Sequence, residues 1–257
     1  AMRMNVSSFD FGFWRQTAML MWRRPDYFVT ANAKAFRAFF SEDYAKKVDH
    51  AIRNDPDYKY YSDIDGDFLR ILNPSKETPR WKKAEEFMLQ GEDRPIPRLV
   101  NKAPWIRLSA RAQITGTNVM TWKLFKMHLR QLRAEDKLIK EGVIKLRPGQ
   151  AFLPEKEIRP IARALADMSG RGGIPVKGLS PVLNAFFFSA RMQIGRASFV
   201  KTLFDPRAIS DPAYRRATKE AWKYFGTAMT GWMSIIVAGQ QLGLWDAEVD
   251  PRSSDFG

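Results

Sequence analysis

The chain has 257 residues, 45% of them hydrophobic and 13% aromatic, so it has enough apolar material for a packed core and is neither disordered nor fibrous. It has no cysteine, which excludes disulfides and thiolate metal sites, and its two histidines, His50 and His128, are too far apart to indicate a zinc or haem centre. We therefore expect no metal and no cofactor. The net charge of +14 favours partners that carry phosphates or anionic lipid headgroups.

Apolar residues recur at helical spacing in the N-terminal third of the chain. A first helix is predicted over residues 9–22, ending before Pro25, because a residue that precedes proline avoids the helical region. A second helix is predicted over 32–50, where apolar residues follow spacings of three and four. Its expected apolar face comprises Ala35, Phe36, Phe39, Phe40, Tyr44 and Val48.

The next segment, 54–79, is rich in Asp, Pro, Gly and Tyr and is predicted to be mostly loop, with at most a short strand at 68–72. The longest helical signal follows at 108–140, where Gly116 is the expected point of a break or bend. Asp211 and Pro212 have the residue types that open a helix. The full set of further predicted helices is 81–90, 108–140, 155–168, 181–204 and 212–243.

Strand alternation is scarce throughout the sequence, so we predict an all-α, multi-helix fold with long connecting loops rich in proline and glycine. The chain divides into an N-terminal helical part over 1–105, which contains the long loop, and a basic helical part over 106–257, which ends in an apolar helix. The alternative is that the two parts form one continuous domain.

A row of basic residues follows one side of the long predicted helix. The spacings are 3, 4, 3, 4 and 3, which at about 100° per residue place the row within a stripe about 100° wide. We call it the basic stripe: Lys123, Lys126, Arg130, Arg133, Lys137 and Lys140. Glu141 at its end has the opposite sign. The stripe is typical of a surface that follows a phosphate backbone, because each neutralised phosphate releases counterions. The competing interpretation is a solvated helix face without a ligand.

Three further arginines are weaker candidates for the same contacts. Arg171 lies in the glycine-rich run 170–173, where backbone N–H groups and a planar guanidinium are suited to an anion. The spacing of this run matches neither the Walker pattern nor the dinucleotide fingerprint, so an ordinary helix end is the competing interpretation. Arg191 and Arg196 are the other two candidates.

Residues 224–245 contain no charged side chain, and as a helix they are long enough to cross a hydrocarbon layer. Gly, Thr, Ser and Gln residues interrupt the segment, and Trp232 lies near its middle, away from the position of an interfacial belt. A buried core helix is the favoured interpretation. Membrane contact and an interface with a partner are the alternatives.

The sequence has no constellation that is typical of an enzyme. Asp63, Asp65 and Asp67 are spaced as in a calcium loop, but Gly66 comes too early and the twelfth position is Pro74, where such a loop has glutamate. No serine lies in a nucleophile elbow, and no histidine lies beside a candidate nucleophile. We therefore expect a protein without catalytic activity and without catalytic residues.

Four segments together resemble a region of the large polyvalent proteins of tailed bacteriophages and prophages. They are 9–16, 169–172, 187–191 and, as the most specific, 250–257, with the sequence Asp-Pro-Arg-Ser-Ser-Asp-Phe-Gly. The resemblance covers nearly the whole chain. Ala190 replaces the proline of the related Phe-Ser-Pro-Arg segment, so the turn at this point is expected to differ.

The resemblance implies a biological setting and supplies no catalytic residue. In such proteins similar stretches lie downstream of enzymatic modules, and the proteins are packaged in the virion interior and delivered into the bacterial host cytoplasm with the DNA. It also implies that the chain is truncated at Gly257, so that other segments of the parent protein are its neighbours.

From these observations the leading hypothesis is a non-catalytic accessory module that binds the DNA or RNA backbone without sequence preference. The basic stripe and the three additional arginines would supply the contacts. Two alternatives stay open: a membrane-associating or structural module of an ejection protein that uses residues 224–245, and a protein–protein assembly domain.

Overall fold

The structure is a computed structural model, and it describes residues 17, 19–62, 104–146, 151–170 and 190–244, with 104–107 and 190–194 described by their backbone alone. Within these residues the chain is helical and contains no β-strand, which confirms the predicted all-α class. The predicted helix at 81–90 and the short strand at 68–72 lie outside the described residues.

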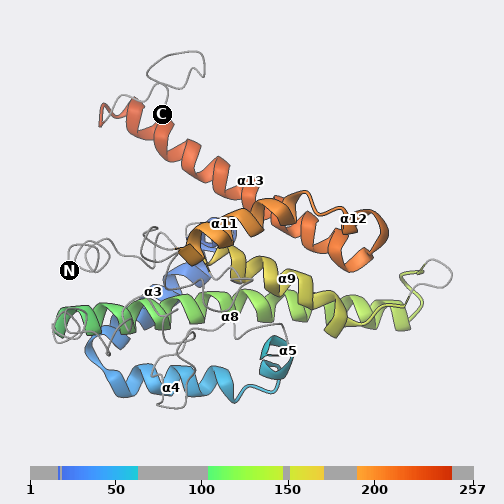
Figure 1. Cartoon of the computed structure of the whole chain (residues 1–257), viewed down its shortest axis with the longest axis horizontal. Helices are drawn as coiled ribbons and strands as arrows, with labels where there is room; N and C mark the ends of the chain where they lie inside the picture. The colour runs from blue at the N-terminus through green and yellow to red at the C-terminus, as the bar shows by residue number, and fades with distance from the viewer. Residues whose placement is uncertain (1–16, 18, 63–103, 147–150, 171–189, 245–257) are drawn as a thin grey trace.

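Helix α8 (Pro104–Lys140) is the longest described helix, and α3, α4 and α9 pack on it. Helix α3 lies along it most extensively, and α4 and α9 also contact it (Figure 1). The helix continues through Gly116, so the predicted break at this residue is wrong. Residues 114–122 are buried without interruption, and packing from several sides stabilises a helical backbone that glycine alone would weaken.

The segment predicted as a single helix over 32–50 forms two helices, α3 (Pro25–Phe40) and α4 (Glu42–Arg53). Between them Ser41 is extended, and its side-chain oxygen accepts a hydrogen bond from the backbone N–H three residues later, at 3.1 Å. The Arg111 guanidinium in α8 donates to two carbonyl oxygens at the end of α3. One helix end is thus satisfied by Arg111 and the next by Ser41, which explains the break.

Helix α3 packs on α8 through alanines. Ala31, Ala35 and Ala38 are buried, whereas Phe36 and Phe40 are 68% and 69% exposed. The prediction that these two phenylalanines belong to the buried face is therefore wrong. Small side chains allow the two helices to approach closely along their length, which large rings at the contact would prevent.

Helix α5 (Tyr58–Ser62) lies inside the segment predicted to be loop. Its Tyr61 is fully buried, and the ring lies 4.9 Å from that of Phe125 and 6.0 Å from that of Trp122, both in α8. A buried aromatic contact of this kind outweighs the loop preference of the surrounding Asp and Pro residues, because local propensity is weak compared with tertiary packing.

The C-terminal half is built on α9 (Pro154–Met168), which contacts α8, α11 and α13. The remaining helices are α11 (Ala190–Leu203), α12 (Arg207–Ser210) and α13 (Pro212–Gln241). The Asp211 side chain accepts a hydrogen bond from the N–H of Ala213 at 2.8 Å, which confirms the predicted start of the last helix. Gly243, with a φ of 68°, follows its end.

A hydrophobic core runs between α8, α9 and α13. The imidazole Nε2 of His128 lies 3.0 Å from the hydroxyl of Tyr224, and this buried pair joins α8 to α13. The predicted division near residue 105 falls in the first turn of α8, and side chains from both sides of it belong to the same buried cluster. Its largest members include Leu20, Tyr61, Phe125, Ile158, Leu165 and Tyr224.

At Gly231, helix α13 lies in close contact with the ring of Trp22. A methyl group built on Gly231 would lie 2.7 Å from Cε2 of Trp22 and closer still to two other ring atoms. We expect Gly231→Ala to lower the free energy of unfolding by about 1–3 kcal/mol, measured by urea denaturation followed by circular dichroism, because the ring must shift. Gly226→Ala, with open space around it, is the control and should raise it by up to about 1 kcal/mol. Equal effects of the two substitutions would contradict this contact.

Candidate functional site

The packing of α8 determines how far each residue of the basic stripe reaches solvent. Lys123 and Lys126 lie near the middle of the helix and are partly buried. The four residues toward its C-terminal end are exposed: Arg130, Arg133, Lys137 and Lys140. The N-terminal end of the stripe therefore lies among other side chains, and its C-terminal end faces solvent.

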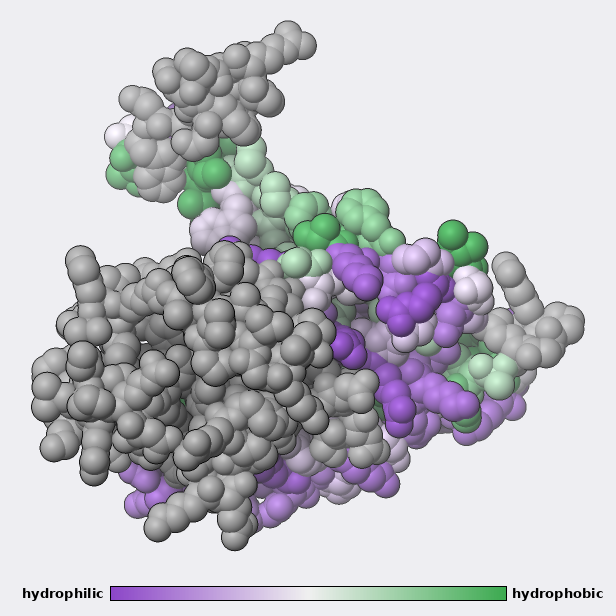
Figure 2. Space-filling model, viewed as in Figure 1, coloured by the Kyte–Doolittle hydropathy of each residue, from purple (hydrophilic) through white to green (hydrophobic). Residues whose placement is uncertain are grey.

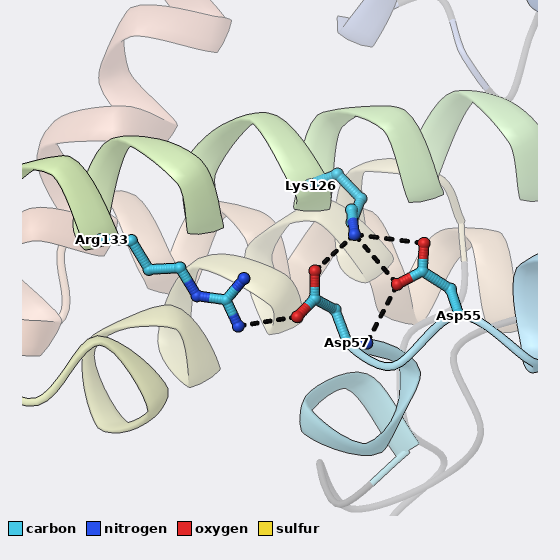
Figure 3. A network of polar contacts seen from close by, with 4 residues as sticks. All are labelled: Asp55, Asp57, Lys126 and Arg133. Atoms are coloured by element: carbon cyan, nitrogen blue, oxygen red, sulfur yellow. Dashed lines mark hydrogen bonds and ion pairs between the residues drawn. The ribbon is translucent and has the colours of Figure 1, made fainter.

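Two stripe residues hold a pair of aspartates between α4 and α5 (Figure 3). The ammonium group of Lys126 donates to Oδ1 of Asp55 at 2.9 Å and also bonds to Asp57. The Arg133 guanidinium donates to Oδ1 of Asp57 at 2.7 Å. The backbone N–H of Asp57 bonds in turn to the Asp55 carboxylate at 3.0 Å. We call these four residues the aspartate clamp.

The aspartate clamp pairs two cations of the basic stripe with carboxylates, although the stripe was predicted to bind a ligand. Asp57 is 8% exposed, and burial alone would raise its pKa, but hydrogen bonds from Arg133 and Lys126 outweigh burial and hold the pKa below its ordinary value of 3.8. The Asp57 carboxylate is therefore ionised at neutral pH and pairs with both Lys126 and Arg133. Lys126 and Arg133 fix the α4–α5 turn against α8, a structural role that the spacing of the stripe did not indicate.

Two other stripe residues make exposed ion pairs within one helical turn. Lys140 lies 2.6 Å from Asp136, and Lys137 lies 3.7 Å from Glu141. The lysine side chains remain 74% and 77% exposed. Such pairs are worth only about 0.3–0.5 kcal/mol, so an incoming phosphate could displace the carboxylates at little cost.

The remaining two stripe residues differ in their surroundings. Arg130 is exposed and has no ion pair within the described part of the chain. Lys123 lies with Nζ 5.0 Å from the ring centre of Tyr27 in α3. Burial lowers the pKa of Lys123, and the nearby positive charge of Lys34 lowers it further.

The three additional arginines are not placed equally by the structure. Arg171 lies outside the described residues. Arg191 belongs to α11, where only its backbone is described. Arg196, also in α11, is exposed. The role of the basic stripe and of these arginines in binding stays a prediction.

Sequence reasoning favoured burial for residues 224–245 and gave contact with a membrane or a partner only as alternatives, but the structure exposes apolar side chains near the end of α13. The buried positions of this helix are Ala217, Ala221, Tyr224, Ala228, Gly231 and Gly239. Beyond Gly231 the helix extends past the other described helices, and Figure 2 shows apolar side chains along it. We call residues 232–244 the arm. Its exposed large apolar residues are Trp232, Met233, Ile235, Val237, Leu242 and Leu244, with exposures of 40–74%.

For the arm, the favoured interpretation of a buried core helix is thus wrong. The side of α13 that packs on the neighbouring helices continues as an apolar side beyond the last packed residues. Tyr224, Ala228, Gly231 and Ile235 follow one another at spacings of four and three, and Leu242 falls on the same side at about 100° per residue. The first three are buried, and so is Gly239 on the same side, whereas the larger side chains of Ile235 and Leu242 are 40% and 74% exposed. The continued spacing of apolar residues is visible in the sequence, but it does not show where the neighbouring helices end and the apolar side becomes exposed.

Neither a membrane span nor a metal site is found in the part of the chain that the structure describes. No described helix has the length and apolar character needed to cross a membrane. Within the same residues no group of three or more His, Asp or Glu side chains is arranged to hold a metal ion. The calcium-like segment at 63–67 lies outside the described residues.

The clamp leads to a pH-dependent prediction for Asp57→Asn. Because the pKa of Asp57 is lowered on folding, its contribution to stability is present above the unfolded value of about 3.8 and is lost as the pH falls through the folded value. We expect the variant to be less stable than the original chain by about 1–3 kcal/mol at pH 7, and the difference to shrink below about pH 4. Urea denaturation between pH 3 and 8 measures both, and a difference that persists unchanged at pH 3 would contradict the ionic role.

Comparison of the chain with protein-family models, with curated proteins and with solved structures finds no match. The resemblance to phage polyvalent proteins therefore stays a prediction. Inference about function rests on the contacts, exposure and charge of the residues described above.

Proposed function

We propose that the chain is a protein–protein assembly module that associates with a second copy of itself through the arm of α13. The observation that carries this proposal is the exposure of six large apolar side chains over residues 232–244, at the projecting end of α13 and just after it. Single scattered exposed apolar residues need no explanation, but their concentration in one short segment is typical of a binding interface.

The distribution of charge favours a second copy as the partner. Two molecules that each carry +14 repel one another over most approaches. Residues 224–245 contain no charged side chain, so two arms can meet without bringing like charges together. Interfaces that relate identical subunits by a two-fold axis use the same patch on both sides, and an apolar segment without charge is compatible with such self-pairing.

The energetic gain is sufficient for a reversible complex. Full burial of a Leu, Ile, Val or Met side chain is worth about 1.5–3 kcal/mol, and the arm side chains are already partly covered. The helical part of the arm is about 15 Å long at 1.5 Å per residue. This is short compared with a standard interface of about 800 Å² per partner, and the expected affinity is therefore modest.

The double variant Ile235→Asp and Leu242→Asp tests the arm. We expect the original chain to associate as its concentration rises in sedimentation equilibrium, at a salt concentration of about 0.3 M that screens the net charge. The variant should weaken association by about 100-fold or more, because pairing the arms would bury unpaired carboxylates.

Val143→Asp with Ile209→Asp is the matched control, because both residues are exposed and apolar but lie outside the arm. The control should associate like the original chain. A monomer at every concentration, or association that both double variants weaken equally, would overturn the proposal. Co-sedimentation of a monomeric chain with liposomes, lost only in the arm variant, would instead support the membrane-associating alternative.

Non-specific binding of a nucleic-acid backbone is the second candidate function. It is favoured by the exposed C-terminal end of the basic stripe, where Arg130, Lys137 and Lys140 face solvent with weak or no carboxylate partners among the described residues. Lys126 and Arg133 are excluded from this smaller surface because they hold the aspartate clamp.

A charge-reversal triple variant tests this smaller surface. We expect Arg130→Glu, Lys137→Glu and Lys140→Glu together to weaken binding to duplex DNA and to reduce the log–log salt slope by about 0.9 for each phosphate that the variant no longer neutralises. The control triple, Arg159→Glu, Lys201→Glu and Lys219→Glu, makes the same change in net charge at exposed residues of other helices. Equally weakened binding in both triples would show that only net charge matters and would contradict a site on α8.

The phage setting remains part of the proposal. A self-associating module in a virion-packaged polyvalent protein would hold copies of the attached modules together during packaging and delivery. Support for this setting comes from the resemblance of segments 9–16, 169–172, 187–191 and 250–257, which lie mostly outside the described residues. No catalytic role is proposed for the chain.

A further inference from the structure

Helix α3 has a second apolar face, on the side opposite its contact with α8. Val29, Phe36 and Phe40 are 67%, 68% and 69% exposed, and Ala33 between them is exposed as well. Their spacings are four, three and four, so at about 100° per residue the four side chains lie within about 60° of one another. We call these four residues the outer stripe.

The exposure of the outer stripe does not stabilise the fold, because burying large apolar side chains would contribute more than burying small ones. The small residues Ala31, Ala35 and Ala38 are buried, while two of the phenylalanines of the helix, Phe36 and Phe40, face solvent. Exposed Phe36 and Phe40 lie edge to face, with ring centres 5.1 Å apart and planes at 74°. The rings therefore form a preformed apolar ridge, and they forgo the roughly 1.5–3 kcal/mol each would gain from full burial.

One edge of the outer stripe is positively charged. Arg37 and Lys34 project from α3 between the stripe and the face that contacts α8, and neither makes an ion pair within the described part of the chain. Lys123 of α8 is close enough to Lys34 for its pKa to be lowered by that charge, after the larger effect of burial. The acidic residues of this region are engaged elsewhere, since Asp26 bonds to Arg24 at 2.6 Å and Glu42 to Lys46 at 2.9 Å.

We propose that the outer stripe of α3 docks an amphipathic helix of another protein, one that carries acidic side chains beside its apolar seam. Spacings of four and three are those with which two helices interlock side chains along a shared seam. Acidic residues beside that seam would pair with Arg37 and Lys34 at the edge of the contact. A second copy of this chain does not fit, because it would bring the same cations together.

The arrangement of the rings argues against a nucleic-acid strand on the same face. Base stacking requires an open aromatic face, but Phe40 is in edge-to-face contact with both Phe36 and Phe39, with ring centres 5.1 Å apart in each pair. Val29 and Ala33 have no π-face. The stripe therefore has the spacing of a helix-docking surface and lacks the platforms of a single-strand site.

The test is binding of the full chain to a labelled synthetic peptide of about four heptads, with Leu at the seam and Glu at the flanking positions, followed by fluorescence anisotropy. A peptide with Lys at the flanking positions is the charge control. We expect the Glu peptide to bind at least about tenfold more tightly than the Lys peptide, and Arg37→Glu to reduce that preference.

The double variant Phe36→Ala and Phe40→Ala should weaken binding of the Glu peptide by about tenfold or more, whereas Phe204→Ala, an exposed ring just after the end of α11, should leave it unchanged. Circular dichroism of both variants checks the fold, which is expected to persist because these rings are outside the core.

Three results would overturn the proposal: no binding of the Glu peptide at about 1 mM, equal binding of both peptides, or binding that the Phe36 and Phe40 substitutions do not affect. Binding of a single-stranded oligonucleotide that only those substitutions remove, without peptide binding, would assign the face to nucleic acid and overturn it as well. The arm variant should bind the Glu peptide normally, because the two surfaces lie on different helices.

Discussion

The fold depends on the burial of the middle of α8 on all sides. Residues 114–122 are covered without interruption, and the small side chains of Thr115, Gly116 and Thr117 leave room for neighbours to approach. Close packing here has a cost, since the hydroxyls of Thr115 and Thr117 are buried and have no hydrogen-bond partner among the described residues. The larger residues that follow, Met120 and Phe125, then receive the rings and aliphatic chains of the surrounding helices, so that α8 forms the centre of the molecule.

Polar and aromatic contacts determine where these neighbours stop. The aspartate clamp ties the α4–α5 turn to one side of α8, and the buried pair of His128 and Tyr224 ties α13 to another. Burial lowers the pKa of His128 to about 4, so the imidazole is neutral at pH 7 and remains in the core without an opposing charge. Farther along α13, Gly231 and the ring of Trp232 contact Trp22, and from there the helix extends past the other described helices. These contacts thus set the length of helix that stays exposed.

Features with a local cause could be predicted from the sequence, and features with a distant cause could not. The start of α13 follows from Asp211 and Pro212, which act within one turn. The break at residue 41 depends in part on Arg111, which lies 72 and 73 positions from the two carbonyl groups that it binds. The positive charge of Lys126 is compensated by Asp55 and Asp57, which lie 71 and 69 positions away. A helical spacing shows that residues share a face, but it does not show which face is buried. Ala35, Phe36 and Phe40 were therefore assigned to the same face, although the structure buries Ala35 and exposes the two rings.

Net charge and available charge are different quantities in this molecule. The net charge of the chain is +14, but not all of the positive charge on α8 is available to a ligand. Lys126 and Arg133 form ion pairs with Asp57 that stabilise the fold. What remains accessible is unevenly distributed: cations at the C-terminal end of α8, a positive edge beside the outer stripe of α3, and no charge along the arm. A neutral apolar arm selects partners by shape and apolar area, whereas an apolar stripe with a positive edge also selects by charge. Under the two proposals above, one chain would use the two surfaces for different partners at the same time, which is the property expected of a module that connects other proteins.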